Sequence, residues 1–318
     1  MTLWDKYPVI KEEMDAFEGT LRRFLSSKNE LIGSAISTMV SAGGKRLRPA
    51  LTIASAHFGE YNMDEIMRIA SSIEILHMAT LIHDDIIDEA KTRRSMETMH
   101  QKYGVNVAIF AGDYLFSTSF SILSVKEDVD TLVHIASIIK SVCEGEIEQY
   151  CSRFSKDMSV YKYLRRIRSK TALLFMLSCE LGANISHCSR DVTNSLKRFG
   201  MFLGMAFQIK DDILDYIGDE TKIGKPVGND LKDGIYTLPL IYAMEKDNNG
   251  KLKDLLYNQP YEIEKIIELV IKYGGIKYAE DLMDKYSKKA KEELNKLPHN
   301  EFRDFLFELT DDLVNREN

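Results

Sequence analysis

The chain of 318 residues has little proline, no alternating strand pattern and no long apolar run. Its six prolines lie near the ends of long segments in which apolar residues recur three or four positions apart, as at Leu132, Ile135 and Ile139. Apolar residues at this spacing share one face of a helix. Strand patterns that alternate apolar and polar residues up to an Asn-Gly or Gly-Gly turn are missing. We therefore predict an all-α fold with ten or more helices.

Other shortages disfavour whole classes of function. No apolar run reaches the roughly 18 residues that a transmembrane helix needs, and the first residues lack the basic and apolar regions of a secretory signal. A net charge of −7 argues against nucleic acid as a partner, because binding phosphate backbones requires a basic surface. The four cysteines form no CxxC pair, which argues against a disulfide framework and for a cytoplasmic setting. No break in composition divides the chain, so we predict one domain over residues 1–318.

An acidic segment ends the apolar stretch at residues 73–94, IEILHMATLIHDDIIDEAKTRR, and contains Asp84, Asp85 and Asp88. With 3.6 residues per turn, Asp84 and Asp88 lie on the same face of a helix. Three carboxylates at the end of an apolar helix repel one another, so folding alone would not select them. Mg²⁺ is commonly bound through one or two carboxylates together with phosphate oxygens and water. The segment is therefore a candidate metal site.

The same spacing recurs in residues 198–215, RFGMFLGMAFQIKDDILD, which lead from an apolar helix into Asp211, Asp212 and Asp215. A single cluster of this kind is more often a solvated helix end than a metal site. Two copies, each ending an apolar helix, favour a pair of acidic walls that face each other and bind metal ions between them. We call the two clusters the first and second aspartate segments.

Basic residues accompany the aspartate segments and suggest an anionic ligand. Residues 43–48, GGKRLR, combine cations with glycines that allow the backbone to approach a ligand closely. The pair Arg93–Arg94 offers planar forks for phosphate oxygens, and Lys170 precedes an apolar helix. Lys222 and Lys225 follow the second aspartate segment in a loop that could close over a diphosphate. For each basic segment, the alternative is a solvated loop between helices.

The order of these motifs resembles that of the trans-isoprenyl diphosphate synthases, from about residue 20 to the C-terminus. The resemblance rests on GGKRLRP (43–49), LIHDDIIDEAKTRR (81–94), KTA (170–172), GMAFQIKDDILD (204–215) and GKPVGNDL (224–231). The segment ILHMATLIHDD is similar to that of the catalytic subunits of hexaprenyl and heptaprenyl diphosphate synthases. The resemblance implies an all-α bundle around a central apolar cavity, a homodimer or heterodimer, and up to three Mg²⁺ ions.

The resemblance also implies roles for particular residues. The metal ions would be held by Asp84, Asp85, Asp88, Asp211 and Asp215. The catalytic set would consist of these residues with Asp212, Lys170 and Lys225. Isopentenyl diphosphate would be bound by Lys45, Arg48, His77 and Arg94, and the allylic diphosphate by Arg93, Lys170, Thr171, Gln208 and Lys225.

The implied reaction joins isopentenyl diphosphate to an allylic prenyl diphosphate and releases pyrophosphate. In the family, an aromatic side chain four or five residues before the first aspartate segment stops chain growth early, whereas Ala79 and Thr80 are small. We therefore predict a long all-trans product, with Phe116 or Phe120 as the floor of the product tunnel. The alternatives are a farnesyl or geranylgeranyl product, or a catalytic subunit that is active only with a second subunit.

Three rival classes remain open. A terpene cyclase shares the fold and the first aspartate segment, but its second motif usually contains Asn, Ser and Glu. A non-catalytic helical partner of a heterodimeric synthase would be expected to lose the aspartates, and this chain keeps all six. A metal phosphohydrolase, suggested by the adjacent His83 and Asp84, would release phosphate without making a longer chain.

Overall fold

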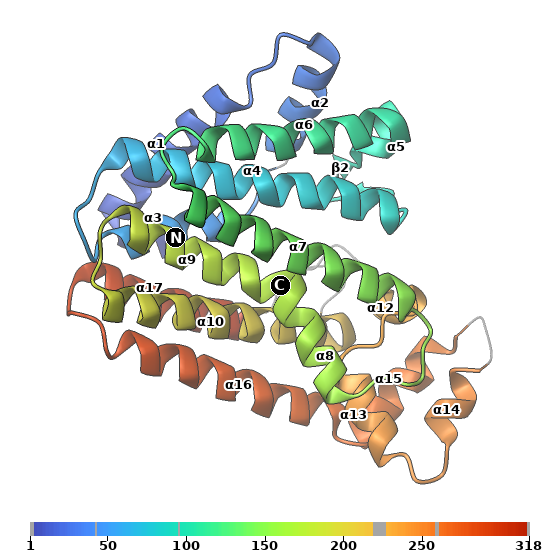
Figure 1. Cartoon of the computed structure of the whole chain (residues 1–318). Helices are drawn as coiled ribbons and strands as arrows, with labels where there is room; N and C mark the ends of the chain where they lie inside the picture. Colours follow the sequence, from blue (N-terminus) through green and yellow to red (C-terminus); the bar gives the residue numbers. More distant parts are fainter. Residues whose placement is uncertain (1–2, 42, 95, 219–226, 258–260, 317–318) are drawn as a thin grey trace. The chain divides into compact units, whose positions relative to one another are not determined.

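The computed structural model describes residues 3–41, 43–94, 96–218, 227–257 and 261–316, and most of them are helical (Figure 1). The predicted all-α fold with ten or more helices is confirmed. The strands of the described part are the two-residue β1 (Thr92–Arg93) and β2 (Met96–Glu97), which pair in an antiparallel hairpin. The single domain and the central cavity remain predictions.

The helices of the described part, in chain order, are η1 (Leu3–Lys6), α1 (Pro8–Phe24), α2 (Glu30–Ser41), α3 (Leu47–Ala56), α4 (Met63–Ile87), α5 (Met99–Tyr103), α6 (Val105–Leu123), α7 (Val129–Cys151), α8 (Val160–Ile167), the π-helical turn η2 (Arg168–Ala172), α9 (Leu173–Ile185), α10 (Arg190–Ile217), α12 (Asn229–Lys232), α13 (Leu238–Lys246), α14 (Lys251–Leu255), α15 (Ile263–Lys272), α16 (Gly275–Leu294) and α17 (Glu301–Asn315).

The chain divides into two compact units whose sequence segments alternate. The first unit comprises residues 1–136, 177–197 and 297–306, and the second comprises residues 137–176, 198–296 and 307–318. The first aspartate segment therefore belongs to the first unit, and the second aspartate segment belongs to the second unit.

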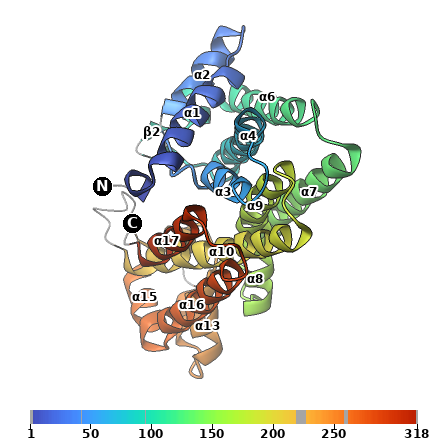
Figure 2. The ribbon, with the colours of Figure 1, turned by 90° about the vertical axis from the view of Figure 1, so that its left-hand side faces the viewer.

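Helix α4 is the central helix of the first unit, and α1, α3 and α6 pack against it (Figure 2). Its N-terminus is capped by Asn62, whose side chain accepts a hydrogen bond from the backbone N–H of Glu65 over 3.3 Å. Its side chains are buried on more than one face, as expected of an interior helix.

Helix α6 runs antiparallel to α4, because residues late in one helix contact residues early in the other. In the first half of α4, the hydroxyl of Ser72 lies 3.0 Å from that of Ser119 in the second half of α6. Near the end of α4, a Cβ added to Gly112 would lie 2.2 Å from His83 Nε2. Only glycine allows α6 to approach the end of α4 this closely.

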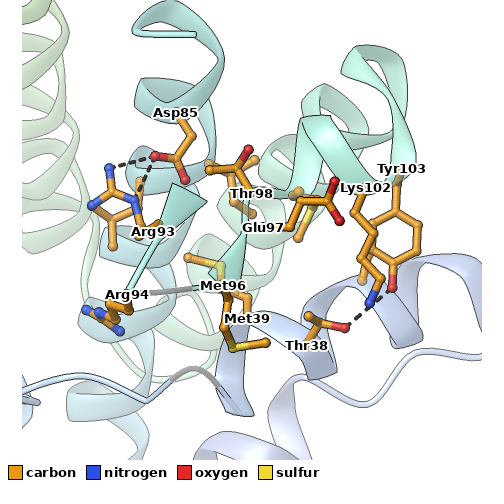
Figure 3. Close-up of a pocket in the computed structure, with 14 residues that line it drawn as sticks. Thr38, Met39, Asp85, Arg93, Arg94, Met96, Glu97, Thr98, Lys102 and Tyr103 are labelled. Carbon is orange, nitrogen blue, oxygen red and sulfur yellow. Dashed lines mark hydrogen bonds and ion pairs between the residues drawn. The ribbon is translucent and has the colours of Figure 1, made fainter. Parts of the chain in front are cut away.

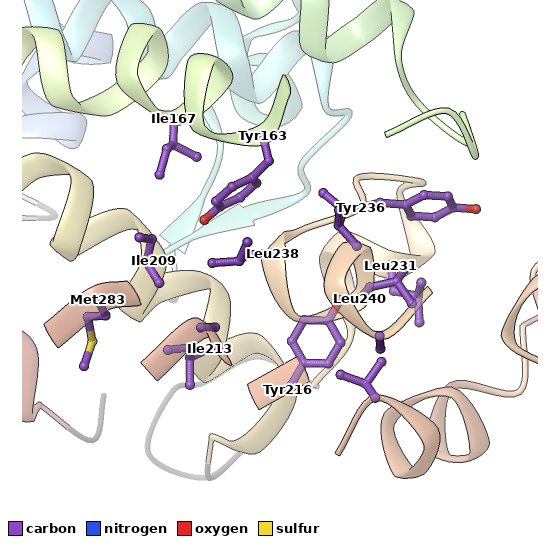
Figure 4. Packing of buried hydrophobic residues seen from close by; sticks show 14 of the residues in the cluster. Tyr163, Ile167, Ile209, Ile213, Tyr216, Leu231, Tyr236, Leu238, Leu240 and Met283 are labelled. Atoms are coloured by element: carbon purple, nitrogen blue, oxygen red, sulfur yellow. The ribbon is translucent and has the colours of Figure 1, made fainter. Parts of the chain in front are cut away.

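The core of the second unit forms where α8, α10 and α13 meet (Figure 4). Tyr163 from α8, Ile209 and Ile213 from α10, and Leu238 from α13 are buried together there. Helix α8 continues through the π-helical turn η2 into α9 without a break. Such turns add one residue to a helix and often occur at functional sites, and η2 contains Lys170 and Thr171.

Candidate active site

The first aspartate segment lies at the C-terminal end of α4, where Asp88 is the capping residue. The backbone N–H of Asp88 donates to the carbonyl of Asp84 over 2.8 Å, so the two residues are one helical turn apart, as predicted. Both side chains are partly buried. The negative end of the helix dipole disfavours carboxylates at this position unless cations compensate them.

Asp85 differs from Asp84 and Asp88, because it is only 6% exposed and forms an ion pair with Arg93. Nε and Nη2 of Arg93 each lie 2.7 Å from Oδ1 of Asp85 (Figure 3). Burial raises the pKa of the Asp85 carboxyl, and the Arg93 charge opposes that rise. The carboxylate of Asp85 therefore positions Arg93, which leaves Asp84 and Asp88 as the better-placed candidates for metal.

The hairpin β1–β2 directs its two arginines to different neighbours. Arg93 lies in β1 and faces Asp85, whereas Arg94 lies in the turn with a left-handed φ of 52°. A Cβ added to Gly44 would lie 2.6 Å from Nη1 of Arg94, so the guanidinium rests directly against the glycine backbone. Strained backbone at a non-glycine residue is common at functional sites. Beside this hairpin is a cavity of about 50 Å³, room for a few water molecules, lined partly by Met39 and Met96 (Figure 3).

Several predicted ligands of isopentenyl diphosphate lie close together in the first unit. His77 is partly buried, and burial together with the charges of Arg48, Arg94 and Arg93 lowers its pKa well below the usual range. Burial and the neighbouring Arg94 lower the pKa of Arg48 to about 10, although Glu74 opposes the effect. The histidine is therefore neutral among several guanidinium groups. We call this group of Arg48, His77 and Arg94 the arginine pocket. Lys45 is exposed in the loop before α3.

Asp212 of the second aspartate segment is buried and hydrogen-bonded. It accepts hydrogen bonds from the hydroxyl of Tyr163 over 2.6 Å and from Nε2 of Gln208 over 2.8 Å. Burial, and next the negative charge of Asp230, raise the pKa of Asp212 to about 7. Asp212 thus links α10 to Tyr163 of α8 inside the second unit.

Asp215 caps the short helix α12, because its two carboxylate oxygens accept hydrogen bonds from the backbone N–H groups of Asn229 and Asp230 over 3.1 and 3.2 Å. Burial, followed by the charge of Asp230, raises the pKa of Asp215 to about 7. Asp230 is the functional candidate that the sequence reasoning missed. The sequence did offer one indication of Asp230. This residue lies in GKPVGNDL (224–231), one of the motifs that resemble the family, but the resemblance assigned it no role.

Asp211, the remaining member of the second segment, pairs with Arg316 near the C-terminus. Nη2 of Arg316 lies 2.5 Å from Oδ1 of Asp211 and donates to the carbonyl of Phe207 over 3.2 Å. The guanidinium carbon lies 4.2 Å from the centre of the Phe207 ring, within the range of a cation–π contact. No sequence signal pointed to this pair, since 105 positions separate the two residues.

The predicted allylic-substrate residues that the structure describes in the second unit also make contacts. The hydroxyl of Thr171 donates to Oε1 of Gln208 over 2.6 Å, and Nζ of Lys170 lies 2.8 Å from Oε2 of Glu146. These contacts bring η2 against α10 and α7. Lys225 lies outside the described residues.

The candidate chain-length residues lie on α4 and α6. Ala79 has no exposed surface, whereas Thr80, Phe116 and Phe120 are partly exposed. The centres of the two phenylalanine rings lie 6.0 Å apart. Because α6 is antiparallel to α4, Phe120 lies near the level of Ser72, about 18 Å along the helix axis from the first aspartate segment.

The acidic residues fit Mg²⁺ in their chemistry, although no group of three His, Cys, Asp or Glu side chains in the described ranges is arranged as a ready-made metal site. The ligands would be hard oxygen atoms, as Mg²⁺ prefers. Burial, and next the negative charge of Asp230, raise the pKa values of Asp212 and Asp215, so a bound cation would favour their ionised forms. Since Mg²⁺ usually keeps several waters and binds phosphate oxygens, few protein ligands are required. In the described part of the chain, no helix is long and apolar enough to cross a membrane.

Comparisons with known proteins show the family to which the chain belongs. The polyprenyl synthetase family model matches residues 29–273. Component 2 of a heptaprenyl diphosphate synthase from Geobacillus stearothermophilus is 36% identical over 312 residues, which cover 97% of each chain. Among solved structures, a heptaprenyl diphosphate synthase from Staphylococcus aureus has a TM-score of 0.92 at 34% identity and covers 97% of this chain and 99% of its own. A geranylgeranyl pyrophosphate synthase from Lactobacillus brevis has a TM-score of 0.92 at 33% identity and covers 99% of each chain. The chain belongs to the polyprenyl synthetase family and is a prenyltransferase.

Proposed function

We propose that this chain condenses isopentenyl diphosphate with an allylic prenyl diphosphate, in the presence of Mg²⁺, to give a long-chain all-trans polyprenyl diphosphate and pyrophosphate. The observation that carries the proposal is the hairpin β1–β2. It directs Arg94 to the arginine pocket and Arg93 to the first aspartate segment. The protein thus has two neighbouring sites that suit two diphosphate substrates. The arginine pocket would bind one through its own cations, and the first aspartate segment would bind the other through metal ions.

In this proposal, Arg48 and Arg94 bind the diphosphate of isopentenyl diphosphate as planar forks. His77 is neutral and can donate or accept a hydrogen bond without adding charge. The pocket needs no metal because its own side chains are cationic. Binding there orients the double bond of isopentenyl diphosphate toward the allylic carbon.

The allylic diphosphate is proposed to bind at the aspartate segments. Asp84, Asp88, Asp211 and Asp215 would hold up to three Mg²⁺ ions, which stabilise the charge that develops on the departing pyrophosphate. Lys170 and Thr171 would contact the same diphosphate from η2. Apolar side chains around the allylic carbon must exclude water, since water would capture the carbocation. The carbocation instead forms a carbon–carbon bond with the isopentenyl double bond, and loss of a proton restores an alkene.

A long product is supported by the small side chain of Thr80 and by the depth of Phe120 on α6. The heptaprenyl synthases among the similar proteins favour the same reading. Because a geranylgeranyl pyrophosphate synthase is similar to the chain to the same degree, a shorter product remains the alternative.

We also propose that the chain pairs with a second subunit, either another copy or a different polypeptide. The relative from Geobacillus stearothermophilus is described as component 2. Large apolar side chains are exposed on α6 and α7, among them Phe110 at 65%, Val129 at 73% and Val133 at 62%. Exposed apolar side chains of this size are typical of protein interfaces. A cytoplasmic location also remains a proposal.

Incubating the purified chain alone with Mg²⁺, farnesyl diphosphate and labelled isopentenyl diphosphate tests the function. We expect labelled products longer than geranylgeranyl diphosphate. Activity only after addition of a companion subunit would support the heterodimer. Release of phosphate without a longer chain would instead indicate a phosphohydrolase, and a cyclic hydrocarbon would indicate a terpene cyclase.

A further inference from the structure

The arginine pocket adjoins a buried carboxylate, Glu74, whose side chain is 5% exposed. It lies one helical turn before His77 on α4. Nη1 of Arg46 donates to Glu74 over 2.9 Å, and Nε of Arg46 donates to Glu18 over 2.7 Å. The side chain of Arg46 is itself only 9% exposed. Arg46 belongs to the basic motif GGKRLR, yet two carboxylates already enclose its guanidinium.

The backbone of Arg46 is also unusual. Its φ of 45° and ψ of 38° place it in the left-handed region, at the residue that caps the N-terminus of α3. A non-glycine residue held there is strained, and it persists only where its surroundings determine its conformation. The ion pairs with Glu18 and Glu74 provide that constraint. They therefore fix the course of the chain between Gly44, which lies under Arg94, and Arg48, which lies beside His77.

Glu74 also balances charge within the pocket. Its negative charge favours the protonated forms of Arg46, Arg48 and Arg94 alike. Without it, guanidinium groups this close would repel one another across a poorly solvated space. The carboxylate thus acts on the pocket in two opposite ways. It holds the arginines in place, but it also lowers the positive potential that attracts an anion.

We infer that Glu74 and Arg46 are positioning residues for isopentenyl diphosphate: their ion pair holds the loop 43–48 so that Arg48 and Arg94 meet the diphosphate, and Arg46 itself does not contact it. This inference rests on the proposed function, because it takes isopentenyl diphosphate to be the ligand of the pocket.

Calorimetric binding of isopentenyl diphosphate to the full chain in EDTA tests the inference. Without metal the aspartate segments carry no cation to attract a diphosphate, so the titration reports on the arginine pocket. We expect Glu74→Gln, which keeps the size of the side chain, to weaken binding about tenfold or more, as misplaced binding groups do. If Glu74 acted only through its charge, removing it would tighten binding. Unchanged or tighter binding would overturn the inference.

A double-variant cycle and steady-state kinetics sharpen the test. If the pair acts as a unit, Arg46→Gln and Glu74→Gln together should weaken binding no more than either alone, whereas additive losses would contradict the pairing. We expect a raised KM for isopentenyl diphosphate, with kcat and the KM for the allylic substrate nearly unchanged. A fall in kcat alone would count against a positioning role.

Two controls separate the possible failures. A wild-type chain that does not bind isopentenyl diphosphate would refute the proposed function, whereas binding that Glu74→Gln leaves intact would refute only the inference. If Glu74→Gln does not fold, as judged by circular dichroism, Glu18→Gln tests the other ion pair of Arg46. The side chain of Glu18 is 35% exposed, so this variant should fold. We expect Glu18→Gln to weaken the binding of isopentenyl diphosphate about threefold. Unchanged affinity in this variant would overturn the inference.

Discussion

The two aspartate segments share one spacing, yet the protein around them differs. In the first segment, Asp85 is buried in an ion pair with Arg93, whereas Asp84 and Asp88 lie partly buried at the end of α4. In the second segment, Asp212 is hydrogen-bonded to Tyr163 and Gln208, and Asp215 caps α12. The comparison shows that i, i+1, i+4 spacing identifies carboxylates of interest, while the surroundings decide which of them can reach a ligand.

Their electrostatics differ as well. The first segment has cations close by, in Arg93 and the arginine pocket. The second also has a cation, Arg316, which pairs with Asp211, but an additional acid, Asp230, adds negative charge beside the more buried Asp212 and Asp215. If both segments bind metal ions as proposed, the metal should therefore stabilise the buried carboxylates of the second segment as well as serve the chemistry. The predictions that follow test this difference.

The largest effect is expected from removing an outer aspartate in either segment. Asp84→Ala and Asp211→Ala should each lower kcat by about 100-fold or more, because the metal-bound charge that stabilises the departing pyrophosphate is lost. Circular dichroism should show unchanged helical content. Asp113→Ala, at a side chain that is 65% exposed, is the control and should remain active. Unfolding of either aspartate variant would mean that the residue is structural.

Gly44→Ala tests the arginine side of the comparison. The added Cβ would lie 2.6 Å from Nη1 of Arg94, and the end of that flexible side chain must move away. We expect the KM for isopentenyl diphosphate to rise about tenfold or more while the melting temperature changes little. Gly19→Ala is a matched control, since a Cβ there meets nothing within 4 Å. An unchanged KM would show that Arg94 does not bind this substrate.

Thr80→Phe should shorten the product, because an aromatic side chain one turn before Asp84 would block a growing hydrocarbon. Chromatography of the products should then show chains shorter than those of the wild type. Ala79→Phe is a different experiment, since Ala79 has no exposed surface and a larger side chain there should cost about 1–3 kcal/mol of stability. Products of unchanged length from Thr80→Phe would place the floor of the tunnel elsewhere.

The smallest effect is the dependence of metal-free stability on pH. The folded-state pKa values of Asp212 and Asp215 are raised to about 7. The folded chain therefore binds more protons than the unfolded chain between about pH 4 and pH 7, and this contribution makes stability fall as pH rises through that window. Denaturant melts in EDTA at several pH values should show this trend.

Asp230→Asn should flatten the trend by removing a negative neighbour of both carboxylates, and Mg²⁺ should restore stability more at pH 8 than at pH 5. A slope that Asp230→Asn leaves unchanged would show that other groups control the pH dependence.

The sequence predicted the fold class because scarce proline and helical periodicity act locally. The family resemblance grouped Arg48 and Arg94 with His77, and the structure brings these side chains together in the first unit, while their role in binding stays a prediction. The sequence could not predict that Arg46 is enclosed by Glu18 and Glu74, because adjacent arginines in one motif look equivalent until the backbone conformation is known. The pair of Asp211 and Arg316 was equally hidden, as it joins residues distant in the chain.

The most direct test of the central claim measures Mn²⁺ binding, as a substitute for Mg²⁺, in the presence of pyrophosphate by electron paramagnetic resonance. If the two aspartate segments bind metal ions around one diphosphate, Asp84→Ala should weaken binding of the ions assigned to the second segment, and Asp211→Ala should weaken binding at the first. Independent losses, in which each variant leaves the affinity of the other segment unchanged, would contradict the account.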